Sequence, residues 1–359
     1  MFNKIVSAAK CVTANIKNTF FQTDKNLYQL SATEKRGLNV VYILPSDKAS
    51  KAGGDKVIYK QSEYMQQFAH LGVTSQILHP RNHSFAHTWF EHQVDFKRDN
   101  QLSAQTDFVV IPEVMVVPHA NMLASLGIRY GIYVQNGYSA SIPLYFCSEQ
   151  ALRDAYNGAE IILTISDDSS ACVRLAFPHL ADKIQRIYYS VDCNKFKPHA
   201  QKENLITYMP RKLARHSELV RFFLQDNLPA GWRLQAIHGL NETGVVDLLS
   251  RSRIFLSFSE FEGCPLPPVE AALSGNLVLG YTGEGAREYW EAPTFVEIYN
   301  GDIKHYVQEI LLAIEQFNSA SAGKLHAQME QVRNRLAQRY SAEAERQSLE
   351  AFLKRIAQS

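Results

Sequence analysis

The residues with the clearest capacity for chemistry are two carboxylates, Glu262 and Glu270, with seven residues between them. An apolar run at 254–256, which predicts the end of a buried strand, precedes them, and residues 271–273 continue as a helix. A strand, a turn rich in glycine and proline and then a helix form the usual layout of a ligand site at the carboxyl edge of a parallel sheet. We therefore expect Glu262 in the loop of such a site and Glu270 about one turn inside the helix.

The start of this helix suits an anionic ligand. Pro267 and Pro268 fit a first helical turn, where no backbone N–H is needed. The free N–H groups of such a turn can bind an anion such as a diphosphate. Arg211 and Lys212 follow another apolar run at 205–208, and they offer a planar fork and a point charge for phosphate oxygens. Both features predict a site for a phosphate-bearing ligand.

Length and composition narrow the class of protein. A chain of 359 residues suits two domains of ordinary size. With 46% hydrophobic and 20% charged residues it can bury a sizeable core, and a net charge of +1 gives no field that would favour nucleic acid. No apolar run reaches the length of a membrane span. Five cysteines without C-x-x-C spacing indicate reduced thiols, so we expect a cytoplasmic protein.

Short apolar runs alternate with helical patterns, and the alternation starts again after residue 200. The predicted strands are 38–44, 73–78, 108–111, 132–135, 161–165, 205–208, 234–237, 254–257 and 277–279. The predicted helices lie at 55–71, 120–126, 217–224, 245–249, 270–274, 303–317 and 341–357. This pattern predicts an α/β fold class with two Rossmann-like parallel-sheet domains. We expect a helical extension at 1–37, domains at 38–197 and 198–340, and a C-terminal helix at 341–359 that could pack back on the first domain.

The stretch around the two carboxylates resembles the E-x7-E motif of retaining nucleotide-sugar glycosyltransferases with the GT-B fold, family 4 in particular. The matching residues are Ser259, Glu262, Gly263, Leu266, Glu270 and Ala271. Cys264-Pro265 stands where Phe-Gly is usual. Further stretches similar to the family are the first loop at 53–54, the linker signature at 189–198 and the turn at 283–288. The resemblance covers most of the chain beyond residue 38 and implies two Rossmann-like domains that face each other across a cleft.

The resemblance implies a role for each residue of the site. Glu262 would contact the transferred sugar or its phosphate end, and Glu270 would accept hydrogen bonds from the ribose hydroxyls. Arg211 and Lys212 would hold the diphosphate, with Arg215 as a rival to Lys212. Further donor contacts would come from the backbone amides of Gly263, Cys264 and Leu266, from the backbone at Gly53 and Gly54, and from the side chain of Gln135.

The implied activity is transfer of a sugar from a nucleotide diphosphate-sugar to a glycan or lipid-linked acceptor, in bacterial-type surface polysaccharide or glycoconjugate synthesis. The configuration of the sugar would be retained, and neither a metal nor a cofactor would be needed. Two alternatives fit the same residues. One is another GT-B enzyme, such as a sugar-nucleotide epimerase or a phosphorylase, and the other is a catalytically silent module that binds nucleotide or glycan. Release of nucleotide that depends on an added acceptor would separate the transferase from the epimerase.

Two other features leave alternatives open. His83 and His87 have helical i,i+4 spacing and lie between His79 and His92, but Pro80 and Asn82 favour a loop over a metal site. Residues 2–21 carry an apolar stripe flanked by lysines. This segment could pack on a domain, or it could lie as a peripheral contact at the inner face of a membrane.

Overall fold

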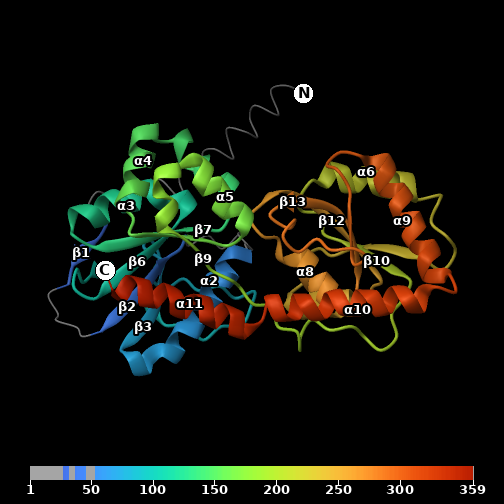
Figure 1. The fold of residues 1–359 in the computed structure, drawn as a ribbon, viewed down its shortest axis with the longest axis horizontal. Helices are drawn as coiled ribbons and strands as arrows, with labels where there is room; N and C mark the ends of the chain where they lie inside the picture. The colour runs from blue at the N-terminus through green and yellow to red at the C-terminus, as the bar shows by residue number, and fades with distance from the viewer. Residues whose placement is uncertain (1–26, 32–36, 46–52, 359) are drawn as a thin grey trace. The chain divides into compact units, whose positions relative to one another are not determined.

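The computed structural model describes residues 27–31, 37–45 and 53–358, so the predicted helix at 2–21 lies outside the described residues. The chain divides into two compact units (Figure 1). The first comprises the residues up to Ile187 together with those from Arg346 onward, and the second comprises Tyr188–Glu345. The sequence suggested a boundary after residue 197, but the two units divide after Ile187. The boundary is earlier because the connecting segment packs into the second unit. Tyr189 is buried there, and Val191 N–H donates to the carbonyl of Tyr340 at 3.0 Å.

The first unit is built on a sheet whose neighbouring strands are all parallel. In spatial order its strands are β4 (Phe96–Lys97), β3 (Val73–Leu78), β2 (Leu38–Ile43), β6 (Asp107–Pro112), β7 (Arg129–Val134), β8 (Ile161–Thr164) and β9 (Ile184–Arg186). A small parallel pair joins β1 (Gln29–Leu30) to β5 (Gln101–Leu102). The central strands are continuous apolar runs because helices cover both faces of the sheet.

Each face of this sheet packs against a different set of helices. The side chains of α3 (Val116–Ser125) and α4 (Glu149–Gly158) join one core with Val109 and Ile111 of β6. On the other face the sulfur of Met65, in α2 (Gly53–Met65), accepts a hydrogen bond from the hydroxyl of Tyr42. Phe352 of α11 (Ala342–Ala357) packs on Phe108 there, with ring centroids 5.9 Å apart. The remaining helices are α5 (Asp167–Ala176) and the 3-10 segments η2 (Gln66–Leu71), η3 (Glu113–Met115), η4 (Gly137–Tyr145) and η5 (Pro178–Lys183).

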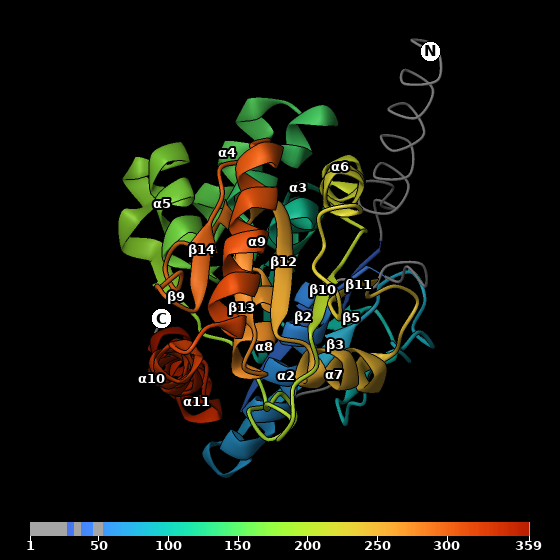
Figure 2. The ribbon, with the colours of Figure 1, turned by 90° about the vertical axis from the view of Figure 1, so that its right-hand side faces the viewer.

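The second unit repeats the architecture with five parallel strands. Their order is β11 (Arg233–Ala236), β10 (Leu205–Tyr208), β12 (Ile254–Glu262), β13 (Leu277–Glu284) and β14 (Phe295–Glu297). Ile254, Leu256 and Phe258 alternate onto the face covered by α6 (Ala214–Leu224) and α9 (Ile303–Asn318). The helices α7 (Glu242–Arg251), α8 (Leu266–Leu273) and α10 (Ala322–Arg339) complete the unit (Figure 2).

These two units confirm the predicted α/β fold class of two parallel-sheet domains. One local expectation was wrong, because β12 runs on to Glu262 and the first carboxylate therefore ends a strand. The extension pairs with β13 up to the register Glu262–Glu284, after an irregularity between Ser259 and Glu262. No helix in the described part of the chain is long and apolar enough to cross a membrane.

Candidate functional site

The carboxyl ends of β10 and β12 carry the charged residues that the sequence singled out. These strands are parallel neighbours, so the segments that follow them leave the sheet at the same edge. There the ammonium of Lys212, just beyond β10, forms an ion pair with the carboxylate of Glu262 at the end of β12. The Lys212 side chain is 46% exposed and that of Glu262 is 19% exposed, so both remain open to a ligand. The structure thus brings together two residues that lie fifty positions apart in the sequence.

A left-handed residue shapes the basic turn. Leu213 has φ of 47°, an uncommon conformation for a branched side chain, and α6 begins directly after it. Arg211 and Lys212 are exposed in the turn that precedes Leu213. Partial desolvation of this half-exposed side chain, and then the charge of Arg211, lower the pKa of Lys212 to about 8. The carboxylate of Glu262 acts against this shift, because an opposite charge nearby favours the ammonium form. Arg215 is instead on α6, 76% exposed and 3.9 Å from Glu218.

The end of β13 supports the backbone of the first carboxylate. Gly283 and Glu284, the last two residues of this strand, have φ of 59° and 68°, in the left-handed region. Gly285 N–H then donates to the carbonyl of Glu262 at 3.1 Å. A Cβ at Gly285 would overlap the carbonyl oxygens of Glu262 and Gly263. The absence of a side chain at Gly285 therefore lets two turns seat against each other at the site.

The helix α8 begins beside this turn, as its prolines predict. Pro265 is its N-cap, and Leu266 and Pro267 occupy the first turn. The positive end of the helix dipole thus lies just after Glu262 and Gly263. Glu270 is one turn further on and is only 8% exposed, on a helix whose residues 268–273 are all buried.

The side chain of Cys264 points into the protein. Its sulfur lies 3.4 Å from the hydroxyl of Tyr189 and 3.7 Å from that of Tyr340. Tyr289 completes this tyrosine group and donates its hydroxyl to the carbonyl of Pro265 at 2.8 Å. Burial holds the pKa of Tyr189 and of Tyr289 well above the ordinary value, so both stay neutral. The side chain of Cys264 therefore anchors the loop, and a ligand at the sheet edge would meet its backbone.

A second group of predicted residues meets at the carboxyl edge of the first unit's sheet. Gly53 and Gly54 start α2, and Gln135 follows the end of β7. The amide nitrogen of Gln135 donates to the carbonyl of Gly54 at 3.0 Å. A Cβ at Gly54 would lie 2.6 Å from the Gln135 oxygen, so the glycine permits this close approach. In the structure the Gln135 amide therefore holds the start of α2.

Glu113 belongs to the same edge and was missed from the sequence. Its two carboxylate oxygens accept from the backbone N–H groups of Gln135 and Asn136, at 3.2 and 3.1 Å. The residue is only 5% exposed, and burial raises the pKa of its carboxyl to about 7 although these hydrogen bonds lower it. The available signal was a carboxylate directly after a wholly apolar strand at 108–112, since a buried charge at such a place needs partners.

Stability should depend on pH through Glu113. The native state keeps this proton up to about pH 7, whereas an ordinary glutamate loses it near 4.5. Unfolding free energy should therefore fall as pH rises between these values and then level off. At about 1.36 kcal/mol per pH unit, the fall is about 3 kcal/mol. Glu113→Gln cannot titrate, so urea unfolding at pH 5, 6, 7 and 8 should show a smaller fall in this variant. An equal fall in both proteins would exclude Glu113 as the cause.

Each histidine of the segment at 79–92 contacts another residue of the first unit. His79 contacts the Tyr59 hydroxyl at 2.8 Å, and His87 pairs with Asp55 at 3.0 Å. His92 contacts the carbonyl of His87, and His83 the side chain of Asn100, each at 3.0 Å. Across residues 27–31, 37–45 and 53–358, no three histidine, cysteine or acidic side chains are placed to hold a metal ion. His79, His87 and His92 pack against Tyr59 or Asp55 of α2, and His83 joins the segment to Asn100.

Comparison with known proteins finds similarity in fold but none in sequence families. No family model matches the chain, and no match was found among curated proteins. Solved structures do resemble it over most of its length. A glycosyltransferase from Rickettsia africae ESF-5 is 15% identical, with a TM-score of 0.62 over 90% of this chain and 100% of that one. The fold is that of the GT-B glycosyltransferases.

Two further GT-B structures are complexes with ligands. HepE from Anabaena, in complex with UDP and glucose, is 14% identical with a TM-score of 0.64 over 88% of this chain and 99% of its own. The catalytic domain of Starch Synthase IV from Arabidopsis thaliana, bound to ADP and acarbose, is 11% identical with a TM-score of 0.52 over 85% and 100%. At such identities the likeness establishes the GT-B fold, and function must be argued from the residues of the site.

Proposed function

We propose that this protein is a glycosyltransferase that moves a sugar from a nucleotide diphosphate-sugar to a glycan or lipid-linked acceptor. The observation that carries the proposal is the ion pair of Lys212 with Glu262 at the sheet edge, next to the start of α8. Such an edge provides cations and a helix N-terminus for a diphosphate, and a carboxylate for sugar hydroxyls. The GT-B fold supports this assignment, since its relatives include complexes with UDP, UDP-glucose and ADP.

Each residue then has a defined task. Arg211 and Lys212 bind the diphosphate, together with the backbone amides of Gly263, Cys264 and Leu266. Glu262 contacts the transferred sugar, and Glu270 accepts from the ribose. In the first unit, we assign donor contacts to the backbone at the start of α2, which begins with Gly53 and Gly54. The Gln135 amide holds this helix start through its hydrogen bond to the carbonyl of Gly54.

The reaction we propose retains the configuration of the sugar. The bond between the anomeric carbon and the diphosphate oxygen breaks, and a bond to the acceptor hydroxyl forms on the same face of the sugar. The hydroxyl proton leaves with the diphosphate. Negative charge grows on the leaving group, so Arg211, Lys212 and the start of α8 stabilise the transition state more than the ground state. These cations take the place of a metal ion in the proposed mechanism.

The test begins with nucleotide binding and ends with turnover. Thermal shifts with UDP, GDP and ADP should identify the base, because a ligand at about 100 times its Kd stabilises a protein by roughly 2.7 kcal/mol. The sugar nucleotide of that base is then incubated with candidate glycans, with and without EDTA. Nucleotide release that needs the acceptor and survives EDTA supports the proposal. Acceptor-independent epimerisation, or tight binding without turnover, would favour the two alternatives.

Glu270→Ala should weaken binding of the preferred nucleoside diphosphate, because the ribose loses a charged acceptor. Hydrogen bonds to charged groups contribute about 1.5–3 kcal/mol, which corresponds to a loss of affinity of roughly 10- to 150-fold. Isothermal titration calorimetry measures it. Since Glu270 lies in a buried part of α8, Glu270→Gln serves as the shape-matched variant, with an intermediate loss expected. Unchanged affinity in a folded Glu270→Ala would remove this residue from the site.

A further inference from the structure

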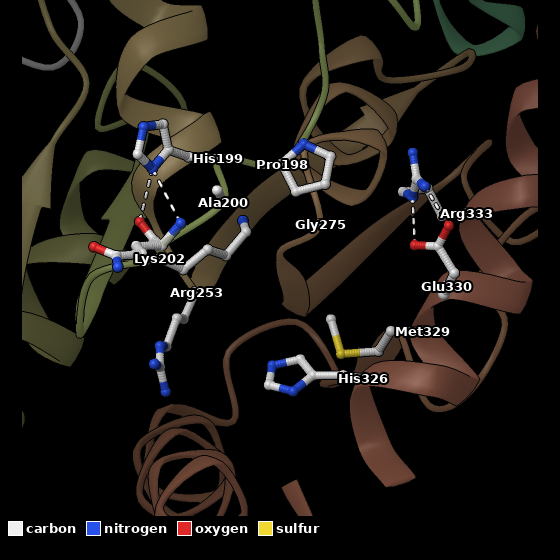
Figure 3. Close-up of a pocket in the computed structure, with 11 residues that line it drawn as sticks. Pro198, His199, Ala200, Lys202, Arg253, Gly275, His326, Met329, Glu330 and Arg333 are labelled. Atoms are coloured by element: carbon white, nitrogen blue, oxygen red, sulfur yellow. Dashed lines mark hydrogen bonds and ion pairs between the residues drawn. The ribbon is translucent and has the colours of Figure 1, made fainter. Parts of the chain in front are cut away.

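The second unit has a pocket of about 660 Å³ at the opposite edge of its sheet from Glu262 (Figure 3). Lys202, Arg253 and Gly275 line it, and they come just before β10, β12 and β13 respectively. Glu262 and Lys212 instead follow the carboxyl ends of β12 and β10. Because all these strands are parallel, the pocket and the proposed donor site lie at opposite ends of the same strands. The remaining wall includes Pro198, His326 and Met329.

Two cations in this pocket have no carboxylate partner among the described residues. The ammonium of Lys202 donates to the carbonyl of Ser252 at 2.6 Å, and the guanidinium of Arg253 lies 5.7 Å from the ring centre of Phe317. Other arginines nearby are neutralised. Arg251 pairs with Glu203 and Asp247, and Arg333, on the pocket wall, pairs with Glu330. Lys202 and Arg253 thus stand out from neighbours of the same charge.

The charge of Arg253 acts on Lys202, and both cations act on the histidine beside them. Burial, and then the charge of Arg253, lower the pKa of Lys202 to about 7. Burial lowers the pKa of His326 as well, followed by the charges of Arg253 and Lys202. An anion between these groups would offset their mutual repulsion and favour the protonated forms. The pocket therefore carries positive charge on Lys202 and Arg253 that is not paired with its one lining carboxylate, Glu330, which pairs with Arg333.

The shape of the pocket sets the size of the anion. Ligand sites usually have volumes of roughly 300–1,000 Å³, so 660 Å³ holds more than a bare phosphate. A Cβ at Gly275 would lie 3.0 Å from Cβ of Pro198 and 3.2 Å from Cε of Lys202, so the glycine leaves space for the lysine. Met329 and Pro198 offer apolar contact for the body of a ligand. Figure 3 shows Pro198 and Met329 among the residues that line the pocket together with Lys202 and His326.

We propose that this pocket is a second binding site, which takes a small molecule bearing a phosphate group, with Lys202 and Arg253 as its phosphate ligands and His326 beside them. Arginine binds phosphate with a planar fork and lysine with a point charge, and both are present here. The body of the ligand, of the size of one sugar, rests against Met329. This inference rests on other residues than the proposed function does, so either could fail while the other holds.

Binding at this site is coupled to proton uptake. The other titratable and charged groups that line the pocket with Lys202 are Arg253, His326, His199, Glu330 and Arg333. At pH 8 the free Lys202 is mostly neutral and must gain a proton to bind phosphate. Affinity should therefore fall by up to about tenfold per pH unit above pH 7. Calorimetry at pH 8 in buffers of different ionisation enthalpy should show the uptake of up to one proton per site.

The experiment uses glucose 6-phosphate and inorganic phosphate as soluble probes, neutral glucose as the control, and phosphatidic acid vesicles for a lipid-borne phosphate. Glucose 6-phosphate should bind better than inorganic phosphate, and glucose should not bind. If the phosphate is lipid-borne, the vesicles co-sediment with the protein instead. Lys202→Ala and Arg253→Gln should each weaken binding at least tenfold. Arg333 lines the same pocket, but its charge is already paired with Glu330. Arg333→Ala should therefore have little effect on binding of the phosphate probe.

Variants of the donor site separate the two sites. Lys212→Ala should bind the phosphate probe as the wild type does, whatever happens to nucleotide binding. Loss of probe binding in Lys212→Ala, or its persistence in both Lys202→Ala and Arg253→Gln, would overturn the second site. If circular dichroism shows that a pocket variant does not fold, the proton uptake that calorimetry measures for the wild type at pH 8 serves as the test of the second site. If neither the soluble phosphates nor the vesicles bind, or if binding at pH 8 takes up no proton, the second site is likewise overturned.

Discussion

Arg211→Ala and Lys212→Ala are each expected to lower kcat by about 100- to 1,000-fold, because each removes a positive charge that stabilises the leaving diphosphate. Affinity for the free nucleoside, which has no phosphate, should change little. Lys212→Ala also takes away the ion-pair partner of Glu262, so we expect the larger loss there. Steady-state kinetics with the preferred donor, combined with calorimetry of nucleoside binding, measures both effects.

Arg215→Ala is the matched control for this pair. Arg215 lies within a few residues of Lys212 and has the same charge, but it is 76% exposed on α6 and points its guanidinium at Glu218. Its removal should leave kcat within about twofold, as is usual for an exposed surface charge. A large loss in Arg215→Ala with none in Lys212→Ala would reverse the assignment of the phosphate-binding cation. Full activity in all three variants would move the site away from this turn.

The fold was predictable from the sequence where one local pattern dominates. The runs at 73–78 and 205–208 are strands with the predicted bounds. The second is a mostly apolar run, as a strand buried on both faces requires, whereas the first has polar residues at 74–76 between buried apolar ends. The helix α4 was missed, since its sequence is mostly polar and only Leu152, Ala155 and Tyr156 are buried. The helix α10 was missed for the same reason, because its apolar positions are few.

The candidate site was predictable only in part. Residue types around a strand end indicated Glu262 and Lys212 separately, but their ion pair depends on β10 and β12 being neighbours. The length of β12 depends on pairing with β13, and the last pairs involve the polar residues Glu262 and Glu284, which show no strand pattern. The hydrogen bonds of Glu113 depend on the fold to a still greater degree. Its partners are backbone amides of another strand's end, and no spacing in the sequence specifies them.

The backbone of the site also depends on close contact at Gly285, which carries no functional group. We expect any side chain at this position to disturb the site. Gly285→Ala would force a methyl group onto the carbonyl oxygens of Glu262 and Gly263, and rigid backbone must move to receive it. We expect the unfolding free energy to fall by about 1–3 kcal/mol. Turnover should fall more than this loss suggests, since misplacing a catalytic group by about 1 Å can lower the rate about 100-fold.

Gly323→Ala provides the control, because nothing lies within 4 Å of a Cβ at that helical position. It should leave turnover unchanged and raise the unfolding free energy by up to about 1 kcal/mol, the helix preference of alanine over glycine. Both variants are compared by urea unfolding and by kcat at a temperature where each remains folded. Wild-type turnover in Gly285→Ala would mean that Glu262 and Gly263 can shift without harm, and the backbone after β12 would then have no part in positioning the sugar donor.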